Sequence, residues 1–400
     1  MYRLYCRIYQ GILWLASFIL PWRKPELLSG ENSLLRLPGL IKEKGISSVL
    51  IVTDAGIASL GLMDGLLAGL DDAGIRYAGY DKTVPNPTIG NIEEAAGVYR
   101  ENGCEAIIAF GGGSPMDCAK GVGARIARPN KTISQMRGLL KVRKRIPTLF
   151  AIPTTAGTGS ETTLAAVITD STTHEKYAIN DMSLIPHYAV LDPVLTVNLP
   201  PRLTATTGLD ALTHAVEAYI GKGNTGETKR AAREATALIF ENLYEAYTNG
   251  QNMTARENMQ RASYLAGIAF TRAYVGNVHA IAHTLGGLYG VPHGLANAVI
   301  LPHMLRYYGK AVYKPLAELA ELVGLTNPGD TGEKKARAFI HAIEDMNERM
   351  DIPGKIKGIK EEDISVMAER AYHEANPLYP VPRILSKREL QDVIEIIRER

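Results

Sequence analysis

The chain has 400 residues, and 46% of them are hydrophobic, which is enough for a large buried core and usually for two domains. Lys and Arg total 44 against 42 for Asp and Glu, so the net charge of +2 gives no field strong enough to gather a phosphate polymer. Nucleic acid is therefore excluded as a partner.

The N-terminal extension, residues 1–30, contains an apolar run at residues 11–20 that follows Arg3 and Arg7. This run is too short to span a bilayer, and residues 21–25 lack the small side chains of a signal-peptide cleavage site. We expect a helix that packs on the protein or on a partner chain, with contact with a membrane surface as the alternative.

The three cysteines show no Cys-x-x-Cys spacing and no other pairing signature. Free thiols in a reducing compartment are the simplest interpretation, so we expect a cytoplasmic protein.

From Ser47 to about Pro200 the sequence alternates short apolar runs with helical stretches, which is typical of a Rossmann-like, doubly wound parallel sheet. We expect strands at residues 49–53, 77–80, 106–110 and 149–152. We expect helices at residues 58–73, 89–101 and 115–127. After Pro200 and Pro201 the pattern changes to Ala-rich amphipathic segments at residues 229–247, 254–270 and 333–349. We therefore predict an NAD-binding α/β domain over 31–200 and an all-α domain over 201–400, with a cleft between them as the default ligand site.

A glycine loop follows the strand at 106–110, with Gly111, Gly112 and Gly113 ahead of Ser114 as N-cap and Pro115 as first helical residue. Glycines let backbone N–H groups approach an anion, and the helix start adds partial positive charge, so a pyrophosphate fits there. The alternative is a tight turn without a ligand, because the loop departs from Gly-x-Gly-x-x-Gly.

Two further features favour a dinucleotide. Residues 153–161 follow the fourth strand and are rich in hydroxyls and glycines, which suits a ribose or a phosphate. Asp54 ends the first strand, where a carboxylate accepts hydrogen bonds from a ribose diol and repels a 2′-phosphate, which favours NAD over NADP. A solvated turn aspartate is the alternative for Asp54.

Potential metal ligands are concentrated in the second half of the chain. Asp210 and His214, four residues apart, share one face of a helix expected over 207–219. Four histidines fall within twenty-five residues, and they are His279, His283, His293 in a Val-Pro-His-Gly turn, and His303. One carboxylate with several imidazoles favours Fe(II) or Zn(II) over Ca(II) or Mg(II). His279 and His283 can face the same cavity, so one can bind metal while the other serves proton transfer.

Four motifs occur in order at residues 111–120, 153–161, 208–219 and 278–286, the last with Pro292, His293 and Gly294. Together they closely resemble the iron-containing (group III) alcohol dehydrogenase family, from about Glu31 to the C-terminus. The resemblance implies that Asp210, His214, His279 and His293 hold the metal, and that His283 lies beside the nicotinamide as a proton relay.

The resemblance also places cofactor contacts in the first half of the chain. The pyrophosphate loop falls on Gly111, Gly112, Gly113 and Ser114, and the other NAD contacts fall on Asp54, Asn86, Thr154, Thr155, Thr158, Thr163 and Lys176. Asp117 and Lys120 match the same motif but can be interpreted as holding the helix in place. Some members of the family carry Asn where this chain has Ala165, which removes one polar contact.

The activity that the resemblance implies is NAD(H)-linked interconversion of small primary alcohols or diols with their aldehydes, with a Lewis-acid metal on the substrate oxygen. We expect a homo-oligomer. One rival keeps this dehydroquinate synthase-like architecture but eliminates and cyclises a phosphorylated substrate, which would need several Lys and Arg where Leu209, Ala211 and Val278 are apolar. A second rival is a nucleotide-binding protein without catalysis.

Overall fold

The computed structural model describes residues 1–172 and 175–399. The chain divides into two compact units. The sheet unit is Pro21–Asn198, and the helical unit comprises Met1–Leu20 together with Leu199–Arg400.

The sheet unit has nine strands and five α-helices among its described residues. The strands are β1 (Glu26–Ser29), β2 (Ser48–Val52), β3 (Arg76–Tyr80), β4 (Ala106–Gly111), β5 (Gly138–Leu139), β6 (Thr148–Pro153), β7 (Ala165–Asp170), β8 (Glu175–Asn180) and β9 (Tyr188–Leu191). The longer helices are α2 (Leu37–Glu43), α4 (Asp64–Ala73), α5 (Ile89–Glu101) and α6 (Gly113–Ala127), and a single turn, α3 (Ala55–Ala58), follows β2.

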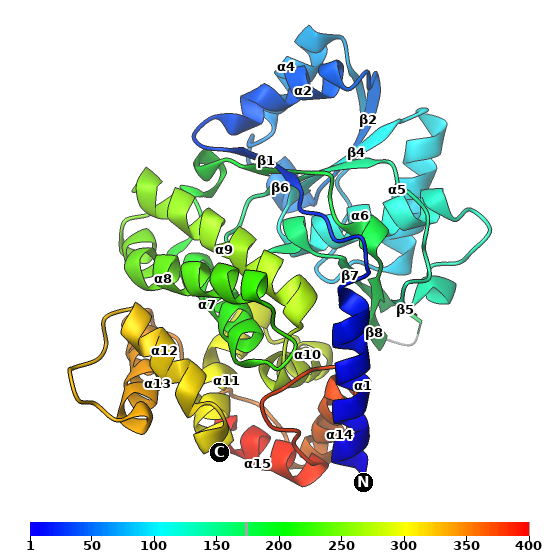
Figure 1. The fold of residues 1–400 in the computed structure, drawn as a ribbon. Helices are drawn as coiled ribbons and strands as arrows, with labels where there is room; N and C mark the ends of the chain where they lie inside the picture. The colour runs from blue at the N-terminus through cyan, green and yellow to red at the C-terminus, as the bar shows by residue number, and fades with distance from the viewer. Residues whose placement is uncertain (173–174, 400) are drawn as a thin grey trace. The chain divides into compact units, whose positions relative to one another are not determined.

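Six strands form one parallel sheet in the order β1-β9-β6-β4-β2-β3, as expected for a doubly wound fold (Figure 1). Along β2, Val49 and Ile51 pack into one core while Leu50 and Val52 pack into the other. This alternation buries both faces of the sheet, because successive side chains of a strand point to opposite sides. Every residue of β2 and β4 is therefore buried, which explains their continuous apolar runs.

The four predicted strands are present as β2, β3, β4 and β6, and the helix predicted at 89–101 is α5. The helix predicted over 58–73 is wrong at its start, because Gly61 adopts a positive φ of 68° and α4 begins only at Asp64. The prediction of Ser114 as N-cap is also wrong. Gly112 caps α6, which begins at Gly113, so Ser114 lies inside the first turn.

The helical unit consists of α-helices and short connecting segments over its described residues. Its helices are α1 (Tyr2–Ser17), α7 (Pro201–Ile220), α8 (Gly226–Thr248), α9 (Met253–Ala273), α10 (Asn277–Tyr289), α11 (His293–Tyr308), α12 (Tyr313–Leu322), α13 (Gly332–Arg349), α14 (Ile364–Ala375) and α15 (Lys387–Ile397). Pro200 and Pro201, the expected boundary, are the N-cap and first residue of α7. The helices α8 and α9 pack against α7, which is buried along most of its length (Figure 1).

Residues 1–30 do not form one extension. Residues 2–17 form α1, which packs in the helical unit, whereas residues 26–29 form β1 at the edge of the sheet, paired with β9. The strand is short and mostly exposed, so it lacks the apolar run that identifies a buried strand in a sequence. Among the described residues, no helix is both long enough and apolar enough to cross a bilayer.

Candidate metal and cofactor sites

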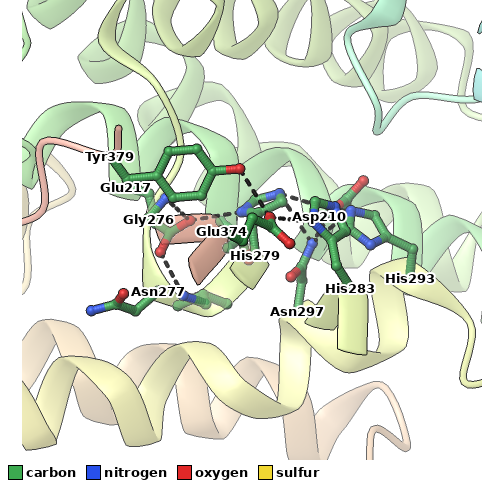
Figure 2. A network of polar contacts seen from close by, with 12 residues as sticks. Asp210, Glu217, Gly276, Asn277, His279, His283, His293, Asn297, Glu374 and Tyr379 are labelled. Atoms are coloured by element: carbon green, nitrogen blue, oxygen red, sulfur yellow. Dashed lines mark hydrogen bonds and ion pairs between the residues drawn. The ribbon is translucent and has the colours of Figure 1, made fainter. Parts of the chain in front are cut away.

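Three helices of the helical unit bring the four predicted metal ligands together. Asp210 and His214 lie one turn apart on α7, His279 lies on α10, and His293 is the first residue of α11. One potential ligand atom of each residue lies within 4.8 Å of those of the other three. Asp210, His214 and His279 are buried, and His293 is half-buried. The cluster therefore combines one carboxylate with three imidazoles. Figure 2 shows Asp210, His279 and His293 of this cluster.

Helix α11 can approach α7 at this point because residue 294 is glycine. A Cβ atom at Gly294 would collide with the backbone of Thr206. The turn expected around His293 is therefore the start of a helix, which holds the imidazole at a fixed position on the side of α7 that carries Asp210.

The carboxylate of Glu217 orients His279. It accepts hydrogen bonds from the backbone N–H groups of Gly276 at 2.8 Å and Val278 at 2.9 Å, and it lies 2.7 Å from Nδ1 of His279. Burial raises the pKa of Glu217 to about 7, and the backbone donors oppose this shift because they stabilise the ionised form. An ionised carboxylate accepts only, so Nδ1 of His279 carries the hydrogen and Nε2 presents its lone pair to the cluster.

The imidazole of His279 is held in the neutral form that binds metals. Burial lowers its pKa well below the usual value, and the neighbouring rings of His214 and His293 act in the same direction. The ring of His214 is itself stacked between Phe270, at 4.1 Å, and His279, at 4.4 Å between centroids. These contacts leave the rings few alternative orientations.

His283 lies beside the cluster and is not one of its four members. Its ring stacks on that of His293 with centroids 5.1 Å apart, and its Nδ1 lies 2.6 Å from Oε1 of Glu374 on α14. The hydroxyl of Tyr379 donates to the same oxygen at 2.9 Å. The side chain of His283 is only partly buried. It therefore lies between the buried cluster and the solvent-exposed surface.

In the sheet unit, the predicted pyrophosphate loop lies where β4 ends and α6 begins. Gly111 has a φ of 143°, and a Cβ there would lie 2.7 Å from Cγ of Pro115, so the turn requires glycine. The start of α6 presents backbone N–H groups that no preceding helical turn satisfies. This is the geometry that binds anions at helix N-termini.

The hydroxyl-rich loop after β6 runs next to this glycine loop. The backbone N–H of Thr154 donates to the carbonyl of Gly111 at 3.1 Å, because β6 is the parallel neighbour of β4. A Cβ at Gly112 would face Thr155, and one at Gly113 would lie 3.1 Å from Cγ2 of Thr158. The structure therefore brings Thr154, Thr155 and Thr158 to the three glycines.

Asn86 and Lys176 meet at the same place. The backbone N–H of Asn86 donates to Oγ of Ser114 at 3.2 Å, and Nζ of Lys176 donates to Oδ1 of Asn86 at 2.7 Å. Burial lowers the pKa of Lys176. Three segments that are far apart in the sequence thus converge on the start of α6.

Asp54 lies at the carboxyl end of β2, the other neighbour of β4 in the sheet. Its Oδ1 accepts a hydrogen bond from the backbone N–H of Ile57 at 2.9 Å and so caps the turn α3. The position matches that of the acidic residue in dinucleotide-binding sheets, while the carboxylate also has a local structural role.

Thr163 faces a buried lysine. Nζ of Lys120, fully buried on α6, lies 2.8 Å from Oγ1 of Thr163 and 2.7 Å from the carbonyl of Ser160. Oγ of Ser160 in turn donates to Asp117 at 3.1 Å. Burial lowers the pKa of Lys120 to about 8 and raises that of Asp117 to about 6, and each charge opposes the shift of the other. Lys120 and Asp117 thus fasten the second loop to the glycine-loop helix.

Comparisons with known proteins agree with this arrangement. A family model described as iron-containing alcohol dehydrogenase matches residues 25–193, and one for the C-terminal part of the Fe-containing alcohol dehydrogenase family matches residues 204–399. The 1,3-propanediol dehydrogenase of Citrobacter freundii is 40% identical over 368 residues, which cover 91% of this chain and 95% of that protein. The chain is a member of the iron-containing alcohol dehydrogenase family.

Two further relatives support the assignment to iron-containing alcohol dehydrogenases. The NAD-dependent methanol dehydrogenase of Bacillus methanolicus is 37% identical over 386 residues, which cover 96% of this chain and 99% of that protein. A crystal structure of a 1,3-propanediol oxidoreductase superposes with a TM-score of 0.90 at 38% identity, and the match covers 94% of this chain and 99% of that one. The predicted family and fold class are therefore confirmed, and the chain is an oxidoreductase of this family.

The residues present fit the iron that the family name implies. Nδ2 of Asn297, on α11, lies 2.6 Å from Oδ1 of Asp210, 3.2 Å from Nε2 of His279 and 3.1 Å from Nε2 of His293. An amide NH₂ group has two hydrogens, whereas three acceptor atoms converge on it. A divalent cation at this point satisfies several acceptors at once, and the mixture of imidazole and carboxylate suits Fe(II) or Zn(II).

Several residues that touch the predicted ones in this iron-containing alcohol dehydrogenase were not predicted from the sequence. Glu217 follows His214 by three residues and Asn297 follows His293 by four, so helical spacing could have identified both. Glu374 and Tyr379 had no such signal, because they come from a distant part of the sequence.

We predict that His279→Ala and His293→Ala each weaken metal binding by more than 100-fold, because each removes a ligand. Glu217→Gln should weaken it by about 10–100-fold, the usual effect of losing the partner of a ligand. Elemental analysis of the purified variants tests this. His303→Ala is the matched control, since Nε2 of His303 lies 3.0 Å from the carbonyl of Gly354 outside the cluster. Full metal occupancy in both His279→Ala and His293→Ala would contradict the ligand assignment.

Proposed function

We propose that this protein is a metal-dependent, NAD(H)-linked alcohol dehydrogenase and aldehyde reductase that acts on small primary alcohols or diols. The observation that carries the proposal is the convergence of one carboxylate and three imidazoles in a buried cluster, in a chain of the iron-containing alcohol dehydrogenase family. The names of the relatives, which include a propanediol and a methanol dehydrogenase, support the substrate class.

The proposed metal ligands are Asp210, His214, His279 and His293, with Fe(II) as the metal and Zn(II) as the alternative. When bound, the cation supplies Lewis acidity at the substrate oxygen, and the nicotinamide takes or gives the hydride. Glu217 keeps His279 in the tautomer that presents Nε2 to the cluster, and burial of the site excludes water from it.

NAD(H) is proposed to bind in the sheet unit. The backbone of Gly111, Gly112, Gly113 and Ser114 would hold the pyrophosphate, and Asp54 would accept hydrogen bonds from the adenosine ribose. The further contacts are assigned to Asn86, Thr154, Thr155, Thr158, Thr163 and Lys176. The convergence of these segments on the start of α6 supports this assignment. In this proposal the sheet unit binds the cofactor and the helical unit binds the metal.

His283 is proposed to move the proton that the reaction releases or consumes. Its Nδ1 contacts Glu374, and the proton transfer is assigned to Nε2. The carboxylate of Glu374 fixes the ring orientation, and Tyr379 fixes the carboxylate in turn. Glu374 and Tyr379 therefore act as positioning residues.

We also propose that the enzyme works in the cytoplasm as a homo-oligomer. Cys6, Cys104 and Cys118 are all buried free thiols, which supports a reducing compartment.

The first test of the proposal is metal-dependent turnover. We expect chelator-treated protein to be inactive, and reloading with Fe(II) or Zn(II) to restore NADH oxidation with short aldehydes and NAD reduction with primary alcohols and diols. Absorbance of NADH at each step of unloading and reloading is the measurement. Equal activity with and without metal would refute the metal-dependent mechanism, and silence of the loaded protein with every substrate would favour a binding protein without catalysis.

The second test concerns cofactor choice. Asp54→Asn removes the charge but keeps a good N-cap for α3, so the fold is preserved. We expect the ratio of kcat/KM for NADP to that for NAD to rise by about tenfold or more, since one lost repulsion is worth on the order of 1.4 kcal/mol. Asp71→Asn, which makes the same charge change at an exposed position of α4, is the control. An unchanged ratio in Asp54→Asn would place its carboxylate away from the ribose.

The third test separates His283 from the metal ligands. His283→Ala should keep the metal but lower turnover by about 10²–10⁴, the usual contribution of a general acid or base. Glu374→Gln should lower turnover by at least about tenfold in the native background and have little further effect in the His283→Ala background, because it acts through the histidine.

The double-mutant cycle is completed by measuring turnover and metal content in the two single variants and the double variant. Tyr379→Phe is a milder variant, because it keeps the carboxylate of Glu374. Metal loss in His283→Ala equal to that in His279→Ala would make His283 a ligand. Additive effects in the double variant would exclude a positioning role for Glu374.

A further inference from the structure

The helix α1 lies outside the residues that the family models match, which begin at residue 25. In Figure 1 it runs as one straight helix beside α14 in the helical unit. The ring of Tyr2 stacks on that of Tyr372 of α14, with centroids 5.6 Å apart. The helix is therefore part of this unit.

The inner face of α1 is polar and well bonded. Nε2 of Gln10, a buried residue, donates to the carbonyl groups of Pro377 at 3.0 Å and Tyr379 at 2.8 Å. Arg7 donates to the carbonyl of Pro382 at 3.1 Å, and Cys6 packs with the apolar residues Val381 and Ile384. These contacts fix the rotation of the helix about its own axis.

The outer face of α1 is apolar and exposed. Ile8 is 55% exposed, Ile12 61% and Leu15 64%, and none of them has a charged neighbour on the same face. The face also includes Leu4, Tyr5, Phe18 and Ile19, all of which are exposed. This arrangement reverses the usual one, in which a surface helix turns its apolar stripe inward and its polar residues toward water. A continuous exposed apolar face of this kind marks an interaction site.

The width of the face decides between two kinds of partner. At 100° per residue, the positions from Phe18 to Tyr5 span roughly 140° of the helix circumference. A second copy of α1 would cover only the narrow seam of a coiled coil, formed here by Tyr5, Ile8, Ile12 and Leu15. The positions beside that seam, such as Leu4 and Phe18, are apolar, although coiled coils place charged residues there. A lipid surface covers the full width.

The charges around α1 match a lipid surface that is anionic. Residues 1–20, which belong to the helical unit, contain two basic residues, Arg3 and Arg7, and no acidic ones. Arg3 pairs with Glu389 at 3.1 Å, yet its side chain stays 65% exposed. Tyr5 and Phe18 add two exposed aromatic rings to the outer face, and aromatic rings favour the boundary between headgroups and acyl chains.

We infer that the outer face of α1 is a docking surface for an anionic lipid bilayer, and that the helix lies flat in the interface with its apolar side chains among the lipids. The polar face, which in most interfacial helices faces water, is covered here by the helical unit itself. The enzyme would thereby be held on a membrane surface without a spanning segment.

Binding of the full-length, metal-loaded protein to vesicles tests this inference. We expect flotation with vesicles of phosphatidylcholine and phosphatidylglycerol, much weaker flotation with phosphatidylcholine alone, and loss of binding at high salt. The ring of Trp14 on α1 is partly exposed and contacts that of Phe18, with centroids 4.8 Å apart, so a blue shift of tryptophan emission should accompany binding. Ile12→Glu and Leu15→Glu should each lower the fraction bound by at least about tenfold, because each removes a buried aliphatic side chain and adds a charge.

Leu60→Glu and Val366→Glu are matched controls, since both make the same kind of change at exposed apolar positions outside α1. All four variants alter exposed side chains, and unchanged metal content verifies that they fold. Absence of native binding to anionic vesicles overturns the inference. If the native protein also forms a larger assembly that Ile12→Glu dissociates, a second copy covers the face instead.

Discussion

Glu217 is a buried carboxylate surrounded by hydrogen-bond donors, and the position of His279 depends on it. Burial of a carboxylate is costly unless donors compensate for lost hydration, and two of those donors are the first backbone N–H groups of α10. Glu217 therefore ties α7 to the start of α10 and sets the tautomer of a proposed ligand. Because Asp210, His214 and Glu217 recur at four- and three-residue intervals, one helix face supplies two of the proposed ligands and the support for a third.

The sequence predicted best those parts of the fold whose burial leaves a periodic signal. β2 and β4 are buried on both faces, so their apolar runs are unbroken, and α5 has a clear start at Thr88 and a regular apolar stripe. The exposed strand β1 left no such pattern. The late start of α4 follows from the left-handed conformation of Gly61, which interrupts a segment whose apolar spacing still fits a helix.

In the candidate sites too, some residues could be predicted from their spacing in the sequence, whereas others are brought together only by the fold. The grouping of histidines, the Asp210–His214 spacing and the glycine loop are local, and the family resemblance turned them into a specific ligand set. The structure brings that set together. It also shows contacts with residues that are distant in the sequence, and these contacts become apparent only in the folded chain. Glu374 reaches His283 across 91 positions, and Lys120 reaches Thr163 across 43, so no periodicity connects them.

The segment at residues 377–382 joins two parts of the helical unit. Gln10 of α1 donates to the carbonyls of Pro377 and Tyr379, while the hydroxyl of Tyr379 donates to Glu374, the partner of His283. The inner face of α1 therefore supports the residues that position His283. The outer face of the same helix makes none of these contacts, because Ile12 and Leu15 are exposed on the opposite side. Substitutions on the two faces consequently separate a role in lipid binding from one in catalysis, although a single helix carries both.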